Sequence, residues 1–440
     1  MNSTSLKSSI ILLFLLIIGM RSKSQIPTPA AHQKQSILLF GATAHLGNGE
    51  VIPRSAIGLR DGKIDLAVAA LDVRMDSSLY DTVIYVNGMH LYPGFIAPNS
   101  RLGLIEVEAV RATRDAADVG GINPHLRALP AYNTDSRVIP TVRSNGVLIA
   151  EVAPKGGRVS GRSSIVQLDA WNWDDALIAE DIGMHLNWPK VNLRYSLQDA
   201  NKEKKRKEAY QKEIRDLKNF FHQAIAYNKV GFHLEKNLRF ESMKAMLNKE
   251  AKLFVHANRI QEIIDVLYFF DDFDLDIVLV GASEAYLATE MLKDRDIPLL
   301  LRRVHDLPLN VDDEIDLPYQ LPRILSDAGL LVGLENSGDM EAMQTRNLPF
   351  YAGTAAAYGL AKEKALSMIT LNTAKILGVD SLLGSIEKGK EATLFISEGD
   401  ALDMRGNQVV LAFIKGRKID LDDPHKMLYR KFSQKYKEDK

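Results

Sequence analysis

Short apolar runs, separated by helix-like segments, dominate the middle of the chain. VLIAEVA (147–153), KLFVHA (252–257) and DIVLVGA (276–282) show no polar alternation, which is typical of strands buried on both faces. The segment RIQEIIDVLYFF (259–270) carries apolar residues at three- and four-residue spacing, which predicts an amphipathic helix. Strand and helix patterns alternate in this way up to residue 335, which predicts parallel β/α units.

The two ends of the chain have a different pattern, with short β-like runs separated by glycine turns such as LGNGE and RDGK. Chain termini often lie close together, so the two ends can form one small domain. We therefore predict a composite β-sandwich built from residues 36–92 and 385–424. Residues 93–384 then form a (β/α)8 TIM barrel, with a doubly wound sheet as the alternative, and residues 425–440 form a peripheral tail.

The N-terminus has the pattern of a secretory signal peptide. Lys7 precedes the apolar run IILLFLLIIGM (10–20), and small polar residues follow it. This run is shorter than the ~20 residues that a membrane span needs. We predict cleavage after Ser24, no membrane span after cleavage, and export to the bacterial periplasm or the medium; an uncleaved anchor is the alternative.

Composition narrows the classes of partner. The chain has no cysteine, which excludes disulfides and thiolate metal sites, and its formal net charge of −1 does not favour nucleic acid. The basic cluster KEKKRK (202–207) is predicted to be the solvated face of a surface helix. A small-molecule substrate or ligand is the expected partner, and a homo-oligomer stays open.

Three motifs carry a resemblance to a known family. PGFIAPNS (93–100) ends the first predicted barrel strand, IAEVAPKGGRVSGRSSIVQLD (149–169) follows it, and TLNTAKILGVDSLLGSIEKGKEATLFI (370–396) closes the barrel. Together with the split sandwich, they resemble the amidohydrolase superfamily of metal-dependent hydrolases, in its imidazolonepropionase-like branch. The resemblance implies a TIM barrel and hydrolysis of non-peptide carbon–nitrogen bonds, in cyclic amides or amidines.

The resemblance also implies a divalent metal such as zinc at the barrel mouth. The family's His-x-His pair after the first strand corresponds to Asn99 and Arg101 in this sequence. An arginine has no free lone pair and stays protonated, so it cannot ligate a cation, and an asparagine offers one weak oxygen at best. Ala282, or Gly281 before it, stands where the second of the later histidines is expected.

Some functional positions are retained. His256 ends a strand and matches the first of the later histidines, while Glu335 or Asp339 can fill the final acidic position. A catalytic zinc normally needs three protein ligands, so we assign no metal ligands in this chain. With either carboxylate, a neutral His256 can act as a general base without a metal.

Several other residues are candidates for substrate binding. Asn99 and Arg101 lie at the mouth, where Arg101 can form a structural salt bridge or clamp an anion. The Gly- and Ser-rich segment PKGGRVSGRSS (154–164) is expected to be a loop forming one wall of the mouth, with Lys155 and Arg158 as its candidates. His185 and Trp188 belong to a tryptophan-rich stretch that either packs in the core or stacks on a ring-shaped ligand.

Two functions therefore stay open. The first is an amidohydrolase-like hydrolase with an altered metal site, in which His256, Glu335 and Asp339 do the chemistry. The second is a catalytically inactive descendant that serves as a binding or scaffold protein in the cell envelope.

Overall fold

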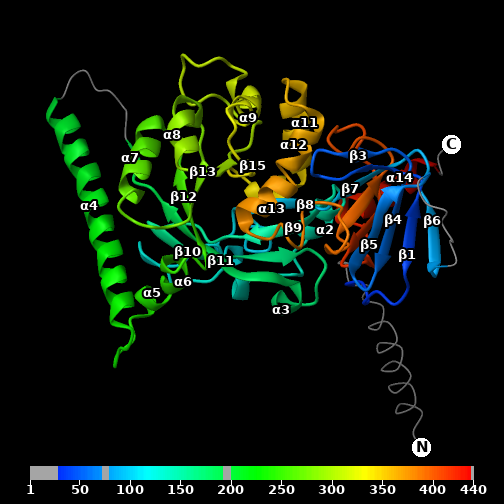
Figure 1. Cartoon of the computed structure of the whole chain (residues 1–440), viewed down its shortest axis with the longest axis horizontal. Helices are drawn as coiled ribbons and strands as arrows, with labels where there is room; N and C mark the ends of the chain where they lie inside the picture. Colours follow the sequence, from blue (N-terminus) through cyan, green and yellow to red (C-terminus); the bar gives the residue numbers. More distant parts are fainter. Residues whose placement is uncertain (1–27, 72–78, 192–199, 438–440) are drawn as a thin grey trace, which may run out of the picture.

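A computed structural model describes residues 28–71, 79–191 and 200–437; the predicted signal peptide lies outside these residues. Three β-sheets organise the described chain, and Figure 1 shows a sandwich at one end and a barrel with its covering helices in the middle. Mixed α/β architecture with a TIM-type barrel and an extra β domain is thus confirmed.

The sandwich combines strands from both ends of the chain. In spatial order, its first sheet contains β5 (Lys63–Ala69), β4 (Ser55–Arg60), β1 (Ile37–Phe40) and β6 (Thr82–Tyr85). Its second contains β18 (Arg417–Lys418), β17 (Val409–Ile414), β16 (Leu394–Ser397), β7 (His90–Pro93), β2 (Thr43–His45) and β3 (Val51–Ile52).

The seam between the two ends is the antiparallel pair β16–β7, in which Leu394 faces Pro93. Leu39, Ile57 and Phe413, all fully buried, belong to one apolar cluster that holds the sandwich together. Burial of such side chains is worth about 1.5–3 kcal/mol each, which explains why the distant chain ends associate without disulfides.

The barrel sheet has eight strands. In spatial order they are β15 (Val332–Leu334), β14 (Leu299–Leu301), β13 (Ile277–Gly281), β12 (Lys252–Ala257), β11 (Leu177–Asn187), β10 (Val159–Gln167), β9 (Val147–Val152) and β8 (Phe95–Ser100). All neighbouring pairs are parallel except those made by β10, which runs antiparallel to both β9 and β11. The barrel therefore departs from a strict (β/α)8 repeat at this strand.

Strand β10 corrects one expectation, because the segment 159–164 is a strand and not part of a loop. Gly161 makes this possible: its φ is +129°, and a β-carbon there would lie only 2.6 Å from the carbonyl oxygen of Leu126. The glycine that suggested a loop is instead needed for a register shift in the strand and for close backbone packing.

The ring closes through a short segment rather than through a direct pair of β15 and β8. The amide of Leu334 donates to the carbonyl of Met368 at 3.0 Å, and the amide of Ile96 donates to the carbonyl of Ile369 at 2.9 Å. Residues 368–369 thus join the two edge strands and satisfy backbone groups that an open edge would leave unpaired.

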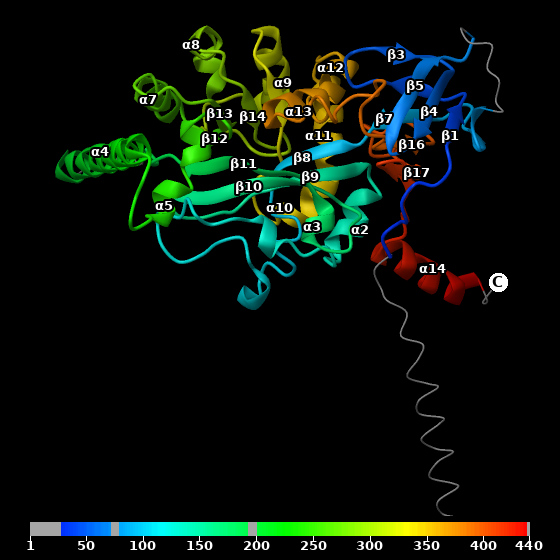
Figure 2. The same ribbon diagram turned by 60° about the horizontal axis from the view of Figure 1, so that its bottom comes forward.

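Helices cover the outside of the barrel (Figures 1 and 2). The longest of them are α7 (Ile260–Phe270), α9 (Leu317–Asp327) and α11 (Leu348–Ala357), and they are joined by the shorter helices α8 (Thr289–Asp294), α12 (Lys362–Ser367) and α13 (Leu371–Leu377). Short helices lie on the loops: α2 (Val138–Arg143), α3 (Trp173–Ala176), α5 (Leu238–Glu241), α6 (Lys244–Leu247) and α10 (Glu341–Gln344). Short 3-10 turns add η2 (Arg111–Thr113), η3 (Leu129–Ala131), η4 (Ala285–Leu287) and η5 (Thr345–Asn347).

Helix α7 shows how the sequence pattern produces this packing. Ile263, Val266, Leu267 and Phe270 recur at three- and four-residue spacing, and all four are buried. Glu262 accepts the backbone amides of Asn258 and Arg259, which satisfies donors that the first helical turn leaves free.

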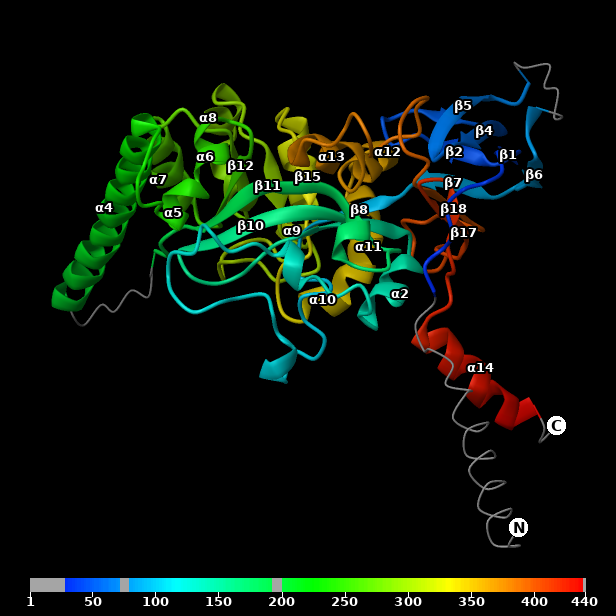
Figure 3. The same ribbon diagram turned by 90° about the horizontal axis from the view of Figure 1, so that it is seen from below.

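Two helices lie at the periphery. Helix α4 (Ala200–Val230) runs along the far side of the barrel from the sandwich (Figure 1), and α14 (Pro424–Lys437) projects from the body beside the sandwich (Figures 2 and 3). In the part of the chain that the structure describes, no helix has the length and apolarity to cross a membrane.

Candidate functional site

Five barrel strands bring the candidate side chains to one end of the barrel. Asn99 lies near the end of β8, Glu151 near the end of β9, His185 near the end of β11 and His256 near the end of β12. Glu335 follows β15 directly. The strands β8, β9, β11, β12 and β15 all run in one direction, so their carboxyl ends form a common mouth, which is where barrel enzymes place their chemistry.

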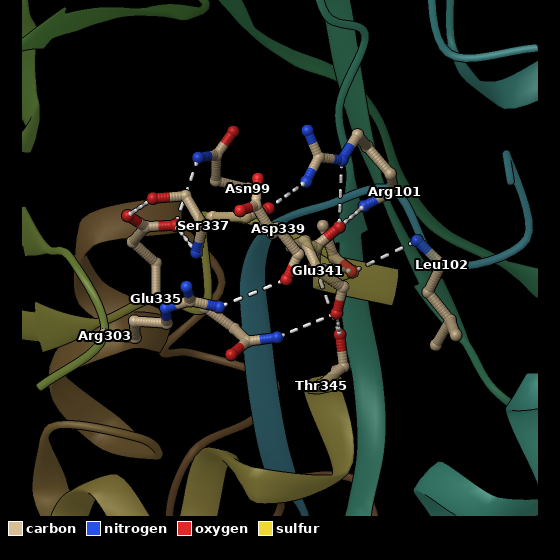
Figure 4. Close-up of polar contacts among 12 residues, drawn as sticks. Asn99, Arg101, Leu102, Arg303, Glu335, Ser337, Asp339, Glu341 and Thr345 are labelled. Carbon is tan, nitrogen blue, oxygen red and sulfur yellow. Dashed lines mark hydrogen bonds and ion pairs between the residues drawn. The ribbon is translucent and has the colours of Figure 1, made fainter. Parts of the chain in front are cut away.

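A buried ion pair occupies the position after the first barrel strand (Figure 4). Arg101 donates from Nε to Oε2 of Glu341 at 3.1 Å, and its backbone amide donates to the same oxygen at 2.8 Å. The two side chains are only 10% and 1% exposed. Ser100 Oγ at 2.9 Å and Thr345 Oγ1 at 3.2 Å donate to the other carboxylate oxygen, so Glu341 is fully engaged.

Glu335 is the second buried carboxyl group of the mouth, and its side chain is shielded from solvent. It accepts the Ser337 amide at 2.6 Å, the Ser337 hydroxyl, and the Asn99 side-chain amide at 3.3 Å. Burial raises the pKa of the Glu335 carboxyl to about 7, although these hydrogen bonds act in the opposite direction. A pKa near neutrality allows this carboxyl to take up and release a proton under ordinary conditions.

A chain of hydrogen bonds links a carboxylate to two histidines. Glu151 Oε1 lies 3.2 Å from His185 Nε2, and His185 Nδ1 lies 3.0 Å from His256 Nε2. Ser163 Oγ at 2.6 Å and the Asn99 amide at 2.9 Å also donate to Glu151. Burial opposes ionisation of Glu151, but His185, Ser163 and the Asn99 amide together keep its pKa below the usual value.

These hydrogen bonds determine which ring nitrogen of His256 carries the proton. With His185 Nε2 donating to the Glu151 carboxylate, His185 Nδ1 accepts from His256 Nε2, and Nδ1 of His256 then carries no proton. Burial, together with the neighbouring His185 and Arg101, lowers the pKa of His256 to about 3. His256 is therefore a neutral imidazole at all physiological pH values.

The residues at the mouth do not fit the divalent metal that the resemblance implies. Arg101 brings a fixed positive charge to the first ligand position, and Ala282 has no donor atom at a later one. Both oxygens of Glu335 already accept hydrogen bonds, and Nε2 of His256 is bonded to His185. Within the described residues, no group of three or more His, Asp or Glu side chains is arranged to hold an ion.

Three predicted substrate-binding residues line a single cavity. Lys155, Arg158 and Trp188 border a space of about 1170 Å³ between the barrel mouth and helix α4. Trp188 is itself buried, and its indole donates to the Tyr210 hydroxyl at 3.1 Å. Arg158 pairs with Glu213 on α4 and donates to the Asn187 carbonyl at 2.6 Å, so it joins the helix to the barrel.

Most of the other predicted site residues lie together at the mouth, and Asp339 does not. Asn99, Arg101, His185, His256 and Glu335 are part of the mouth, whereas the Asp339 side chain is exposed and only its carbonyl is engaged, by Arg303 at 3.2 Å. Asn99 adopts a left-handed backbone with φ of +50°, which non-glycine residues rarely do. This conformation turns the end of β8 so that the Asn99 amide reaches Glu151 and its side chain reaches Glu335.

Sequence reasoning missed two central carboxylates and one serine. Glu151 is the single charge in the apolar run VLIAEVA, and a charge in a strand buried on both faces is a signal that could have been used. Ser337 lies in an irregular loop and Glu341 lies in the short helix α10 after it, and neither segment has a periodic pattern that would mark a residue as buried.

Comparisons with known proteins agree with this architecture. A family model described as the amidohydrolase family matches residues 324–419. The curated protein Amidohydrolase tasK of Hapsidospora irregularis is 20% identical over 391 residues, which is 82% of this chain. The matched region makes up 39% of that protein, so the chain spans well under half of its relative's length.

Solved structures extend the likeness to most of the barrel and sandwich. An amidohydrolase from Thermotoga maritima MSB8 superposes with a TM-score of 0.76 at 22% identity, covering 87% of this chain and 99% of that one. An adenosine deaminase from Xanthomonas campestris with bound zinc has a TM-score of 0.53 at 13% identity, covering 94% and 99%. At these identities, the structures establish a shared fold.

The predicted resemblance to the amidohydrolase superfamily is thus confirmed by a family match, a curated relative and the fold. The chain is similar to amidohydrolase-family hydrolases. Its assignment to the imidazolonepropionase-like branch stays a prediction.

Proposed function

We propose that this protein is an amidohydrolase-like hydrolase of small molecules that acts on non-peptide carbon–nitrogen bonds, in the cyclic amide or amidine class, without the usual metal site. The observation that carries this proposal is Glu335, a buried carboxyl group at the carboxyl end of β15 whose pKa is near 7. A general acid–base group works best when its pKa lies near the working pH.

The proposed chemistry uses proton transfer at Glu335. Water adds to the electrophilic carbon, the carbon–nitrogen bond breaks, and the proton that the ionised carboxyl takes from water is returned to the leaving nitrogen. Ser337 is half-buried and donates its hydroxyl to Glu335, so it connects the carboxyl to the mouth. His256 stays neutral, and the Glu151–His185 pair holds its Nδ1 unprotonated as an acceptor for a substrate N–H or for water.

The experiment is a turnover assay on a panel of cyclic amides and amidines, with a chelator present. We expect the natural protein and Glu290→Gln, a surface control on α8, to turn over at least one compound. Glu335→Gln keeps the shape but cannot accept the proton, so it should lose about 10²–10⁴-fold in rate. Equal rates for Glu335→Gln and Glu290→Gln would contradict the role of Glu335.

A second candidate function rests on a different observation. The buried Arg101–Glu341 pair fills the position where the family places its first metal ligands, as expected of a barrel retained for binding only. In that case the protein is a non-catalytic binding or scaffold module of the envelope. Binding of a panel compound at the mouth without turnover under any condition would support this function over hydrolysis.

The place of action is part of the proposal. The pattern at residues 1–24 supports export to the bacterial periplasm or the medium, and a small molecule is the proposed partner. Whether the N-terminus is removed can be read from the intact mass of the exported protein.

A further inference from the structure

Helix α14 is an amphipathic helix whose apolar face is left exposed. At 3.6 residues per turn, Leu428, Tyr429, Phe432 and Tyr436 fall within an arc of about 100°. Their exposed fractions are 44%, 75%, 54% and 66%, respectively. A surface helix of a globular protein normally turns such a face toward the core, so this face is available to something outside the described chain.

The attachment of α14 involves only its first turns and leaves the rest of the helix projecting from the body. Asp423 caps the helix by accepting the backbone amides of His425 at 2.8 Å and Lys426 at 3.0 Å. Asp422 Oδ2 lies 2.6 Å from a guanidinium nitrogen of Arg430, which is one helical turn after Lys426. Beyond these contacts the helix projects clear of the barrel and the sandwich (Figures 2 and 3).

The charges of α14 are all of one sign. Lys426 and Arg430 lie opposite the apolar face, Lys431 and Lys435 flank it, and the sequence from residue 424 to 437 contains no aspartate or glutamate. Basic residues on the polar face, with aromatic and aliphatic residues on the other, are the pattern of a helix that lies in a membrane interface.

We propose that α14 docks the protein on an anionic phospholipid surface, with Leu428, Tyr429, Phe432 and Tyr436 in the headgroup region. Anionic headgroups attract nearby lysine and arginine side chains, and tyrosine is favoured at the boundary between water and lipid. A second copy of this chain is a poorer occupant, because pairing two α14 helices face to face brings two sets of flanking lysines together. The helix lies on the membrane and does not cross it.

The test is co-sedimentation of the full chain with vesicles of phosphatidylglycerol or of phosphatidylcholine. The variants are Phe432→Ser/Tyr436→Ser on the apolar face and Lys431→Gln/Lys435→Gln beside it. Phe232→Ser is the matched control, because Phe232 is an exposed phenylalanine far along the chain from α14. All variants share the same N-terminus, residues 1–24 included, so the differences between variants isolate the contribution of α14.

We expect Phe432→Ser/Tyr436→Ser to weaken binding to phosphatidylglycerol vesicles at least tenfold, and Phe232→Ser to leave it unchanged. Each removed lysine should weaken it about fivefold at low salt, and about 1 M salt should abolish that difference. Equal binding of all variants would overturn the proposal. So would a dimer that forms without vesicles and is lost in Phe432→Ser/Tyr436→Ser, because the face would then be occupied by a second copy.

Discussion

Replacing Arg101 by methionine tests whether the buried ion pair holds the barrel mouth together. Methionine keeps the length of the side chain but removes the charge, so Glu341 remains as a buried carboxylate that is 1% exposed. Breaking one side of a buried pair typically costs about 3–5 kcal/mol. Glu341 would still accept from the Arg101 amide, Ser100 and Thr345, so we expect about 3 kcal/mol, at the lower end of that range.

The assay is urea unfolding at pH 7, with a double-mutant cycle of Arg101→Met and Glu341→Gln. The two changes should be coupled by at least about 1.5 kcal/mol, because either one alone leaves a buried partner uncompensated. Arg302→Met is the control: Arg302 pairs with Asp306 at 2.7 Å, but both side chains are about a third exposed, so it should cost less than about 1 kcal/mol. If Arg101→Met costs no more than Arg302→Met, the pair does not stabilise the mouth and this reasoning fails.

Three further predictions concern the carboxyl groups and the metal. The folded-state pKa of Glu335 is raised from 4.5 to about 7, so its contribution to stability is fully present below pH 4.5 and is lost as the pH rises through 7. In urea unfolding, the free energy of unfolding of Glu335→Gln, relative to that of the natural protein, should therefore increase by about 3 kcal/mol between pH 4.5 and pH 8. The pKa of Glu151 is lowered, so its contribution is present above pH 4.5 and is lost on acidification; Glu151→Gln should lower the free energy of unfolding at pH 7, and a variant as stable as the natural protein would contradict the hydrogen-bonded chain. Calorimetry should show that the natural protein binds no zinc at the mouth, whereas the triple variant Asn99→His, Arg101→His and Ala282→His should bind about one ion. Zinc binding by the natural protein at this site would show that our exclusion of a metal there is wrong.

The barrel and the composite sandwich could be predicted because their signals are repetitive and local. Uniformly apolar runs mark strands covered on both faces, and the return of glycine turns at the C-terminus marks the strands that complete the sandwich. Strand β10 was missed because its Gly161 and its serines indicate a loop. The positive φ of Gly161 and the close approach of Leu126, both visible only in the structure, explain why a glycine stands inside a strand.

Part of the site could be predicted because the end of each apolar run marks the end of a barrel strand. Asn99, Arg101 and His256 were found in that way, and Glu335 directly follows the last strand. The partners of these residues were not predictable, because Glu341 meets Arg101 across 240 positions of sequence and Glu151 meets His185 across 34. Such pairings depend on tertiary geometry that a single sequence does not encode locally.

The central claim is that the mouth performs acid–base hydrolysis through Glu335 without a bound metal. The most direct test is the pH dependence of kcat for a panel substrate, measured with an excess of chelator. The account predicts a rate that rises with pH, with a midpoint near 7 in the natural protein, and that is lost in Glu335→Gln. A rate abolished by the chelator, or an unchanged midpoint in Glu335→Gln, would contradict it.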